Sequence, residues 1–470
     1  MNNEMADDRG KIPNILKIGE ISTDSMSMDY DTDVLDPVVN TESFCRFVVP
    51  NKGILHSFSK ITLCVDTAGG TFPTNIGVNS LIQRATLRVG TAVIAEIDDY
   101  NHYQGYKSMF IHNPINLERE TYTTSRILNY DNILKNDTGA RSLVNGSGYG
   151  LSTDGNYVIA ANGKTGNLVP IDELFTGNKP VFSVALADLF PMLREHQLPL
   201  YLINEQISIE LHFVSAASLK RCIYDKEAGG ATGTLFTMDT TETKLIADYL
   251  YYTDGDIMAR FQQQNMSSPI SYDYPDYRLN KRTFTQAQLQ GLTSLDIGGA
   301  GRVVRKVITA LESNLAEPDS SLTNVYSSFS PATATNNIQL FTTNCIFNDQ
   351  RLYPVDRSNP SVHYYDLVRA EMNIPAITRA EWSKEGVAGG FTEGYEYLGF
   401  AQGSSTEGYL GKFFYIVYDV GSANQRINSR GIQLELKYGA TLAGTFTHRA
   451  WVELEKTATL QAGMFRTFLK

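Results

Sequence analysis

Cysteine is scarce in this chain of 470 residues, and its placement limits the chemistry that the chain can carry. The four cysteines are Cys45, Cys64, Cys222 and Cys345, with no CxxC pair and no histidine cluster beside them. The spacing of a zinc site is therefore absent. Cys64 and Cys345 lie in apolar runs typical of strands, which predicts buried free thiols and a reducing compartment. The cysteine spacing alone is also compatible with a disulfide.

Long apolar runs are also missing. The longest, Phe413 to Tyr418, is far too short to cross a bilayer. The first ten residues, MNNEMADDRG, are polar and acidic, unlike a secretory signal peptide. We therefore expect a soluble protein that is not secreted by the common route.

Positive charge is in deficit. The chain has 40 Lys and Arg against 51 Asp and Glu, a formal net charge of −11, and no basic stretch. Proteins that grip nucleic-acid phosphates usually show the opposite balance. Direct binding of a genome is therefore disfavoured, which leaves open only a basic patch formed in three dimensions.

Catalytic and metal-binding motifs are absent as well. The seven histidines form no HxH or HExxH pair, and no GxSxG occurs. They are His56, His102, His112, His196, His212, His363 and His448. His212 falls on the polar face of a predicted strand, where a solvated or interface histidine is expected. Gly146, Gly148 and Gly150 make neither GxGxxG nor a P-loop.

Two acidic patterns call for comparison with known sites. The run from Asp29 to Asp33 has Val34 and Asn40 where a calcium loop needs Gly and Glu. Glu453 and Glu455 lie beside Trp451 and could mimic a glycosidase cleft, but an alternating strand from Ala450 to Lys456 predicts an outward, solvated face. We expect no catalytic, cofactor-binding or metal site, and no enzymatic activity.

Aromatic residues are abundant, with 26 Tyr and 22 Phe, and they favour strands. The clearest strand is Ile207 to Phe213, in which apolar and polar residues alternate. Residues 84–89 and 92–97 form two alternating runs around Gly90-Thr91, the pattern of a β-hairpin. Residues 185–195 predict a short helix that Pro191 limits.

A weak internal repeat indicates two related units. The hairpin at Gly90-Thr91 has a counterpart at Asn348-Asp349, and each runs into a stretch with Tyr, Asp and His. Strand 207–213 likewise has a counterpart in 432–438. The fold class is therefore all-β, with two tandem antiparallel sandwiches, long loops and a few short helices.

The length also favours two domains. We expect an N-terminal arm at residues 1–40 and a first sandwich at 41–217, with a long loop at about 101–180. A linker at 218–243 and a second sandwich at 244–470 follow. The arm carries an apolar island, residues 12–18, and is either a mobile tail or a segment that orders against a neighbouring subunit.

The order of these segments resembles the double jelly-roll major capsid proteins of tailless DNA viruses, a family that serves polinton-like viruses, virophages and nucleocytoplasmic large DNA viruses. The first roll is similar in residues 84–97, in Leu186 to Leu193, in 198–202 and in 207–213. The second is similar in Tyr251 to Met258 and in Phe347 to Pro354.

The resemblance implies that the fold consists of two tandem eight-stranded antiparallel jelly-roll sandwiches. It also implies a structural protein of the virion, assembled in the host cytoplasm or nucleus. It implies a homotrimer forming a pseudo-hexagonal capsomer that tiles an icosahedral shell. Partners would be neighbouring capsomers, penton and minor capsid proteins, and an inner membrane or minor protein reached by the arm, with no direct nucleic acid and no cofactor. The alternative is a jelly-roll virion protein that binds carbohydrate or a receptor.

Overall fold

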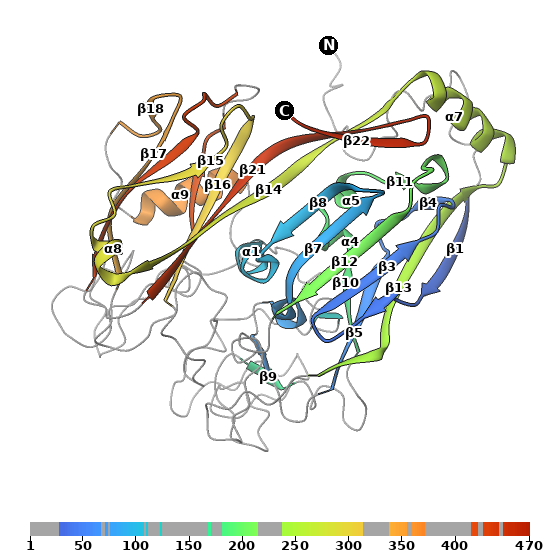
Figure 1. The fold of residues 1–470 in the computed structure, drawn as a ribbon, viewed down its shortest axis with the longest axis horizontal. Coiled ribbons are helices and arrows are strands. Elements are labelled where there is room, and N and C mark those ends of the chain that lie inside the picture. The colour runs from blue at the N-terminus through green and yellow to red at the C-terminus, as the bar shows by residue number, and fades with distance from the viewer. Residues whose placement is uncertain are drawn as a thin grey trace, which may run out of the picture.

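The computed structural model shows two β-sandwiches, each built from two antiparallel sheets (Figure 1). It describes residues 28–66, 71–73, 76–107, 110, 123–124, 168–170, 181–214, 237–313, 338–354, 360–371, 415–421, 426–440 and 445–470. Among these residues, no helix is long and apolar enough to cross a membrane.

The first sandwich consists of two sheets that are named here by their central strands. The β13 sheet has the order β10 (Val181–Ala185), β5 (Lys60–Asp66), β13 (Thr237–Tyr252), β1 (Met28–Leu35), and β4 (Ile54–Leu55) and β11 (Leu198–Pro199) extend it. The β12 sheet has the order β2 (Val39–Asn40), β3 (Phe44–Val49), β12 (Ile207–Phe213), β7 (Ile82–Val89), β8 (Ala92–Asp98). A separate pair joins β6 (Thr71–Pro73) to β9 (Leu168–Pro170).

The second sandwich has the same plan. The β21 sheet has the order β19 (Ile416–Asp419), β16 (Val304–Ser313), β21 (Thr445–Gln461), β14 (Ile270–Thr285), and β22 (Met464–Leu469) pairs with the end of β21. The β20 sheet has the order β15 (Ser294–Gly298), β20 (Ile432–Ala440), β17 (Ile338–Phe347), β18 (Gln350–Arg351).

The two sandwiches are strand-for-strand equivalent. In chain order, β1, β3, β5, β7, β8, β10, β12 and β13 correspond to β14, β15, β16, β17, β18, β19, β20 and β21, and equivalent strands hold equivalent places in their sheets. Eight antiparallel strands wound into two facing sheets make a jelly roll. The predicted fold of two tandem eight-stranded jelly rolls is therefore confirmed, and so is the correspondence of β12 with β20.

Both predicted hairpins are present. β7 and β8 pair around Gly90, whose φ of 58° lies in the left-handed region, and β17 and β18 pair around Asn348 and Asp349, with φ of 52° and 60°. Left-handed turn residues match the twist of the flanking strands. A helix follows each hairpin, namely α1 (Tyr100–Lys107) and α9 (Pro360–Glu371).

The pairing of β13 differs from the expected domain boundaries. β13 begins at Thr237, inside the expected linker, and pairs with β5, β4 and β1, so that residues 244–252 close the first sandwich and do not open the second. β1 was expected within the arm but is a strand of this sheet, with Val34 opposite Ile246. The sequence missed both points because this pairing joins segments more than 200 residues apart.

Helices lie between several of the strands. The predicted helix at 185–195 is present as α4 (Leu186–Leu189) and α5 (Pro191–Glu195), divided where Pro191 begins the second piece. The others are the 3-10 helices η3 (Gly77–Leu81) and η6 (Leu200–Leu202), α7 (Gly255–Ser267) and α8 (Gln286–Gln290). α7 connects β13 to β14 and therefore joins the two sandwiches.

The alternation of buried and partly exposed residues along the strands produces the core. In β3 every second residue, Cys45, Phe47 and Val49, is buried, as expected when one face of a sheet packs inside a sandwich. Cys45 and Cys345 are buried free thiols, and Cys64 is fully buried, as predicted for Cys64 and Cys345. Cys222 lies outside the described residues.

Candidate functional interface between the two sandwiches

Two long paired strands extend from the second sandwich to the first. β14 and β21 contain 16 and 17 residues and pair along their whole length. Figure 1 shows this ribbon, with β22, passing over the end of the first sandwich. Tyr274 on β14 donates its hydroxyl hydrogen to the carbonyl of Ile94 at 2.7 Å, and Lys456 on β21 donates to that of Val93 at 3.2 Å. Both acceptors lie on β8.

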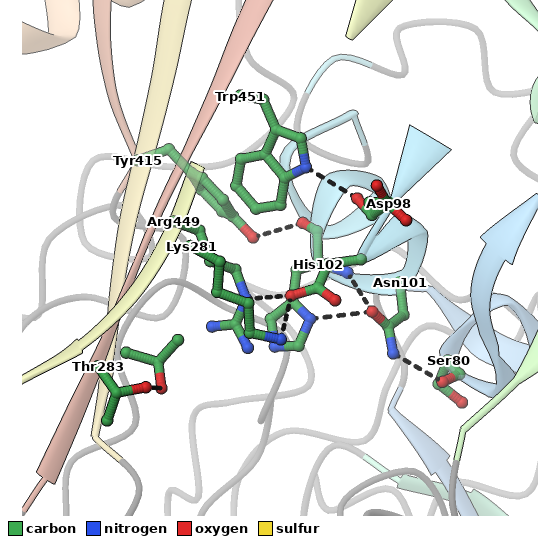
Figure 2. Close-up of polar contacts among 11 residues, drawn as sticks. Ser80, Asp98, Asn101, His102, Lys281, Thr283, Tyr415, Arg449 and Trp451 are labelled. Atoms are coloured by element: carbon green, nitrogen blue, oxygen red, sulfur yellow. Dashed lines mark hydrogen bonds and ion pairs between the residues drawn. The ribbon is translucent and has the colours of Figure 1, made fainter. Parts of the chain in front are cut away.

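The region where the two sandwiches meet is called the junction here. Its centre is the corner between β8 and α1, shown in Figure 2. The indole N–H of Trp451 donates to the carbonyl of Asp98 at 3.0 Å. The carboxylate of Asp99 accepts from Arg449 Nε at 2.8 Å and lies 2.7 Å from Lys281 Nζ. A carboxylate of the first sandwich thus neutralises two cations of the second.

The environment of Asp99 keeps it ionised. Burial alone would raise the pKa of this carboxyl, but Arg449, His102 and Lys281 outweigh it and lower the pKa to about 2. Asp99 has a φ of 47°, and the left-handed region is one that Asp and Asn tolerate better than most residues. The strand that ends at Asp98 therefore turns sharply enough to aim Asp99 at its partners.

Polar contacts at α1 fix this corner on both sides. Asn101 donates to the carbonyl of Ser80 at 3.3 Å, within the first sandwich. Tyr415, which precedes β19 of the second sandwich, donates to the carbonyl of His102 at 2.8 Å. Figure 2 shows these contacts on opposite sides of the helix. α1 is therefore held by both sandwiches.

A second charged cluster lies beside the first. The carboxylate of Glu371, at the end of α9, contacts Lys306 and accepts from the hydroxyl of Tyr106, and it lies 3.4 Å from Lys107 Nζ. Lys306 Nζ also lies 3.3 Å from Glu453 Oε2. Burial would raise the pKa of Glu371, but Lys107 and Lys306 lower it to about 2. Two cations and two carboxylates thus balance where α1, α9, β16 and β21 meet.

Aromatic rings fill the space between the charged groups. The ring of Tyr103 on α1 lies 4.7 Å from that of Tyr277 and 6.3 Å from that of Trp451. All three are buried. Burial, together with the nearby Glu453 carboxylate, raises the pKa of Tyr103 and of Tyr277 well above 10, so both stay neutral. The junction therefore combines buried aromatic rings with paired charges.

The prediction that residues 450–456 present an outward, solvated face is wrong. Trp451 is 0 % exposed and Glu453 only 6 %, because the corner between β8 and α1 of the first sandwich covers this face. Glu453 is paired with Lys306, and Glu455 accepts from Arg305 at 3.0 Å. These two carboxylates are held by cations in the junction rather than placed in a glycosidase-like cleft.

The other residues weighed from the sequence are dispersed. His212 does lie on the outer, polar face of the β12 sheet, 2.8 Å from Arg84, whereas His448 is buried inside the second sandwich. Asp31 and Asp33 flank Lys52 at 3.4 Å and 2.6 Å. Within the described ranges no three His, Cys, Asp or Glu side chains are grouped to hold a metal. Gly146, Gly148, Gly150 and His112 lie outside those ranges.

Sequence reasoning missed the charged residues of the junction. Asp99 and Arg449 are 350 positions apart, and neither belongs to a motif. The local signal that the sequence offers is Arg449, a charged residue that shares a strand face with Trp451. A buried charge needs an oppositely charged or hydrogen-bonding partner, but nothing in the sequence identifies Asp99 as the partner of Arg449.

No protein-family model and no curated protein sequence matches this chain. Solved structures do. The capsid of the PBCV-1 virus matches with a TM-score of 0.52 at 13 % identity, over 94 % of this chain and 97 % of that one. The mavirus major capsid protein matches with 0.52 at 11 %, over 93 % and 90 %, and the Sputnik virophage structure with 0.51 at 11 %, over 94 % and 88 %. At these identities the likeness concerns the fold, and the chain has the double jelly-roll fold of these viral capsid structures.

Proposed function

We propose that this chain is a major capsid protein, a structural subunit of an icosahedral virus shell and a component of the virion. The observation that carries this proposal is the junction. It holds two equivalent jelly rolls together as one building block through buried ion pairs and aromatic packing. The capsid proteins with which the chain shares its fold support this role.

The block is proposed to act as a homotrimer, so that six jelly rolls form a pseudo-hexagonal capsomer. Its partners would be neighbouring capsomers, penton and minor capsid proteins. The net charge of −11 favours contacts with proteins over direct contacts with a genome. No catalytic role is proposed, because the charged groups of the junction are engaged with one another.

The oligomeric mass tests this proposal. Light scattering coupled to size-exclusion chromatography should give three times the chain mass of 52.2 kDa. A stable monomer at high protein concentration would contradict the capsomer. Saturable binding of a glycan by that monomer would favour the alternative of a carbohydrate-binding virion protein.

The segment before β1 is proposed as an arm that contacts a neighbouring capsomer, a minor protein or an inner membrane. Because β1 is a strand of the β13 sheet, the informative deletion removes residues 1–27 and keeps Met28 onward. Particles that assemble and survive heating as well as wild type would rule the arm out as a tether.

A further inference from the structure

We propose that the side chains of Lys456 and Asp276 join in an isopeptide bond, an amide that links β21 to β14 within one chain. Lys456 Nζ lies 3.4 Å from Asp276 Oδ1, and the two side chains are only 4 % and 2 % exposed. Lys456 is opposite Tyr274 in the register of the two strands, and Asp276 follows Tyr274 by two positions, so both side chains lie on one face of the paired strands. An amine and a carboxyl group are thereby held in contact away from water.

Contacts on both sides hold the two groups in place. Lys456 Nζ donates to the carbonyl oxygen of Val93 on β8 at 3.2 Å, which ties the amine to the first sandwich. Arg278 Nε lies 3.0 Å from the other carboxyl oxygen, Asp276 Oδ2. A cation at this oxygen stabilises the negative charge that develops on it when an amine attacks the carboxyl carbon. The amine is therefore positioned and the carboxyl group is polarised.

Burial favours the uncharged, reactive form of both groups. It raises the pKa of Asp276, against the opposing effects of Lys456 and Arg278, and it lowers the pKa of Lys456, against the opposing effect of Asp276. A lysine amine is nucleophilic only without its proton, and a carboxyl group releases hydroxyl far more readily when it is protonated. The buried pair of Lys306 and Glu371 shows the opposite shifts, since the pKa of Glu371 is lowered to about 2 and that of Lys306 is raised. That second pair remains ionic.

The reaction is a condensation that needs no co-reactant. Nζ of Lys456 attacks the carboxyl carbon of Asp276, the new C–N bond forms, and the bond from that carbon to Oδ1 breaks. One amine hydrogen and the departing hydroxyl group leave together as water. The product is a neutral amide, so the free-energy cost of keeping two charged groups out of water disappears.

The position of the bond lets it constrain most of the second sandwich. β14 is the first strand of this sandwich, β21 follows all its other strands except β22, and Asp276 and Lys456 are 180 positions apart. A covalent link between them encloses β15 to β20 in one loop and limits the conformations of the unfolded chain. An amide also persists in a reducing compartment, where a disulfide does not.

The intact mass of the full-length chain, measured after denaturation, tests the bond. We expect wild-type protein that has spent days in the folded state to be lighter by one water molecule than the mass calculated from its sequence. Digestion with trypsin should then release a branched peptide that joins residues 261–278 to residues 450–466, because trypsin cuts at the arginines that bound both segments but not at an acylated lysine.

Two variants identify the lysine. Lys456→Met removes the amine, so this variant should have the mass calculated from its sequence. Lys470→Met is the matched control, because Lys470 lies 3.1 Å from Asp273, also on β14, but their side chains are 39 % and 58 % exposed. The control should lose water as wild type does. A wild-type chain at its calculated mass and without the branched peptide, or a water molecule lost equally by Lys456→Met, would overturn the inference. If Lys456→Met does not fold, the branched peptide of wild type decides alone. The bond forms within one chain, so its absence would leave the capsid role untouched.

Discussion

The ion pairs of Asp99 make the junction testable by a single substitution. Asp99→Asn keeps the size and the left-handed backbone conformation, because Asn tolerates that region as well as Asp does. It removes the charge that Arg449 and Lys281 share. Arg449 is 4 % exposed, so its guanidinium would remain buried without the charge of Asp99.

The expected loss follows from two estimates. Lowering the pKa of Asp99 from 3.8 to about 2 corresponds to about 2 kcal/mol in favour of the ionised junction. Leaving one member of a buried pair without its partner costs about 3–5 kcal/mol. We therefore expect Asp99→Asn to lower the free energy of unfolding at pH 7 by about 3 kcal/mol. Chemical denaturation and hydrogen exchange of the amides in α1 and β21 would measure it.

Asp349→Asn is the matched control. Asp349 also has a positive φ, 60°, and also contacts an arginine, Arg430, but their side chains are 55 % and 79 % exposed. Exposed ion pairs contribute about 0–1 kcal/mol, so this variant should be nearly neutral. Equal and small losses in both variants would refute the claim that a buried charge pair holds the junction closed.

Two further predictions concern acid and a turn. The pKa of Glu371 is lowered from 4.5 to about 2, so its contribution of about 3 kcal/mol is complete above pH 4.5 and is lost as the pH falls toward 2. Denaturation curves across this range should show the loss in wild type and a weaker dependence in Glu371→Gln; identical slopes would contradict it. Gly431→Ala places a Cβ 2.9 Å from the carbonyl oxygen of Gly298 at a φ of 74° and should destabilise by about 1–3 kcal/mol, whereas Gly255→Ala, with no atom within 4 Å, should be neutral or mildly stabilising in the same thermal assay.

Local patterns were sufficient for the strands and turns. The alternation in β12 and β20 and the turn residues at Gly90 and Asn348 are short-range signals, and the structure contains each of these elements. The order of these elements also predicted the second jelly roll, because equivalent strands recur in the same order along the chain.

The junction and the closing strand could not be predicted in this way. The alternation around Trp451 is the same whether water or another sandwich covers the strand, so the sequence favoured a solvated face. The corner between β8 and α1, more than 300 positions away, covers Trp451 in the structure. The pairing of β13 with β1 likewise depends on residues more than 200 positions apart.

An image of the purified protein tests the central claim most directly. If the chain is a capsid subunit with two equivalent jelly rolls, class averages from negative-stain electron microscopy should show hexagonal blocks with three-fold symmetry and six lobes. Separate particles with two lobes each, at concentrations where capsid proteins associate, would contradict it.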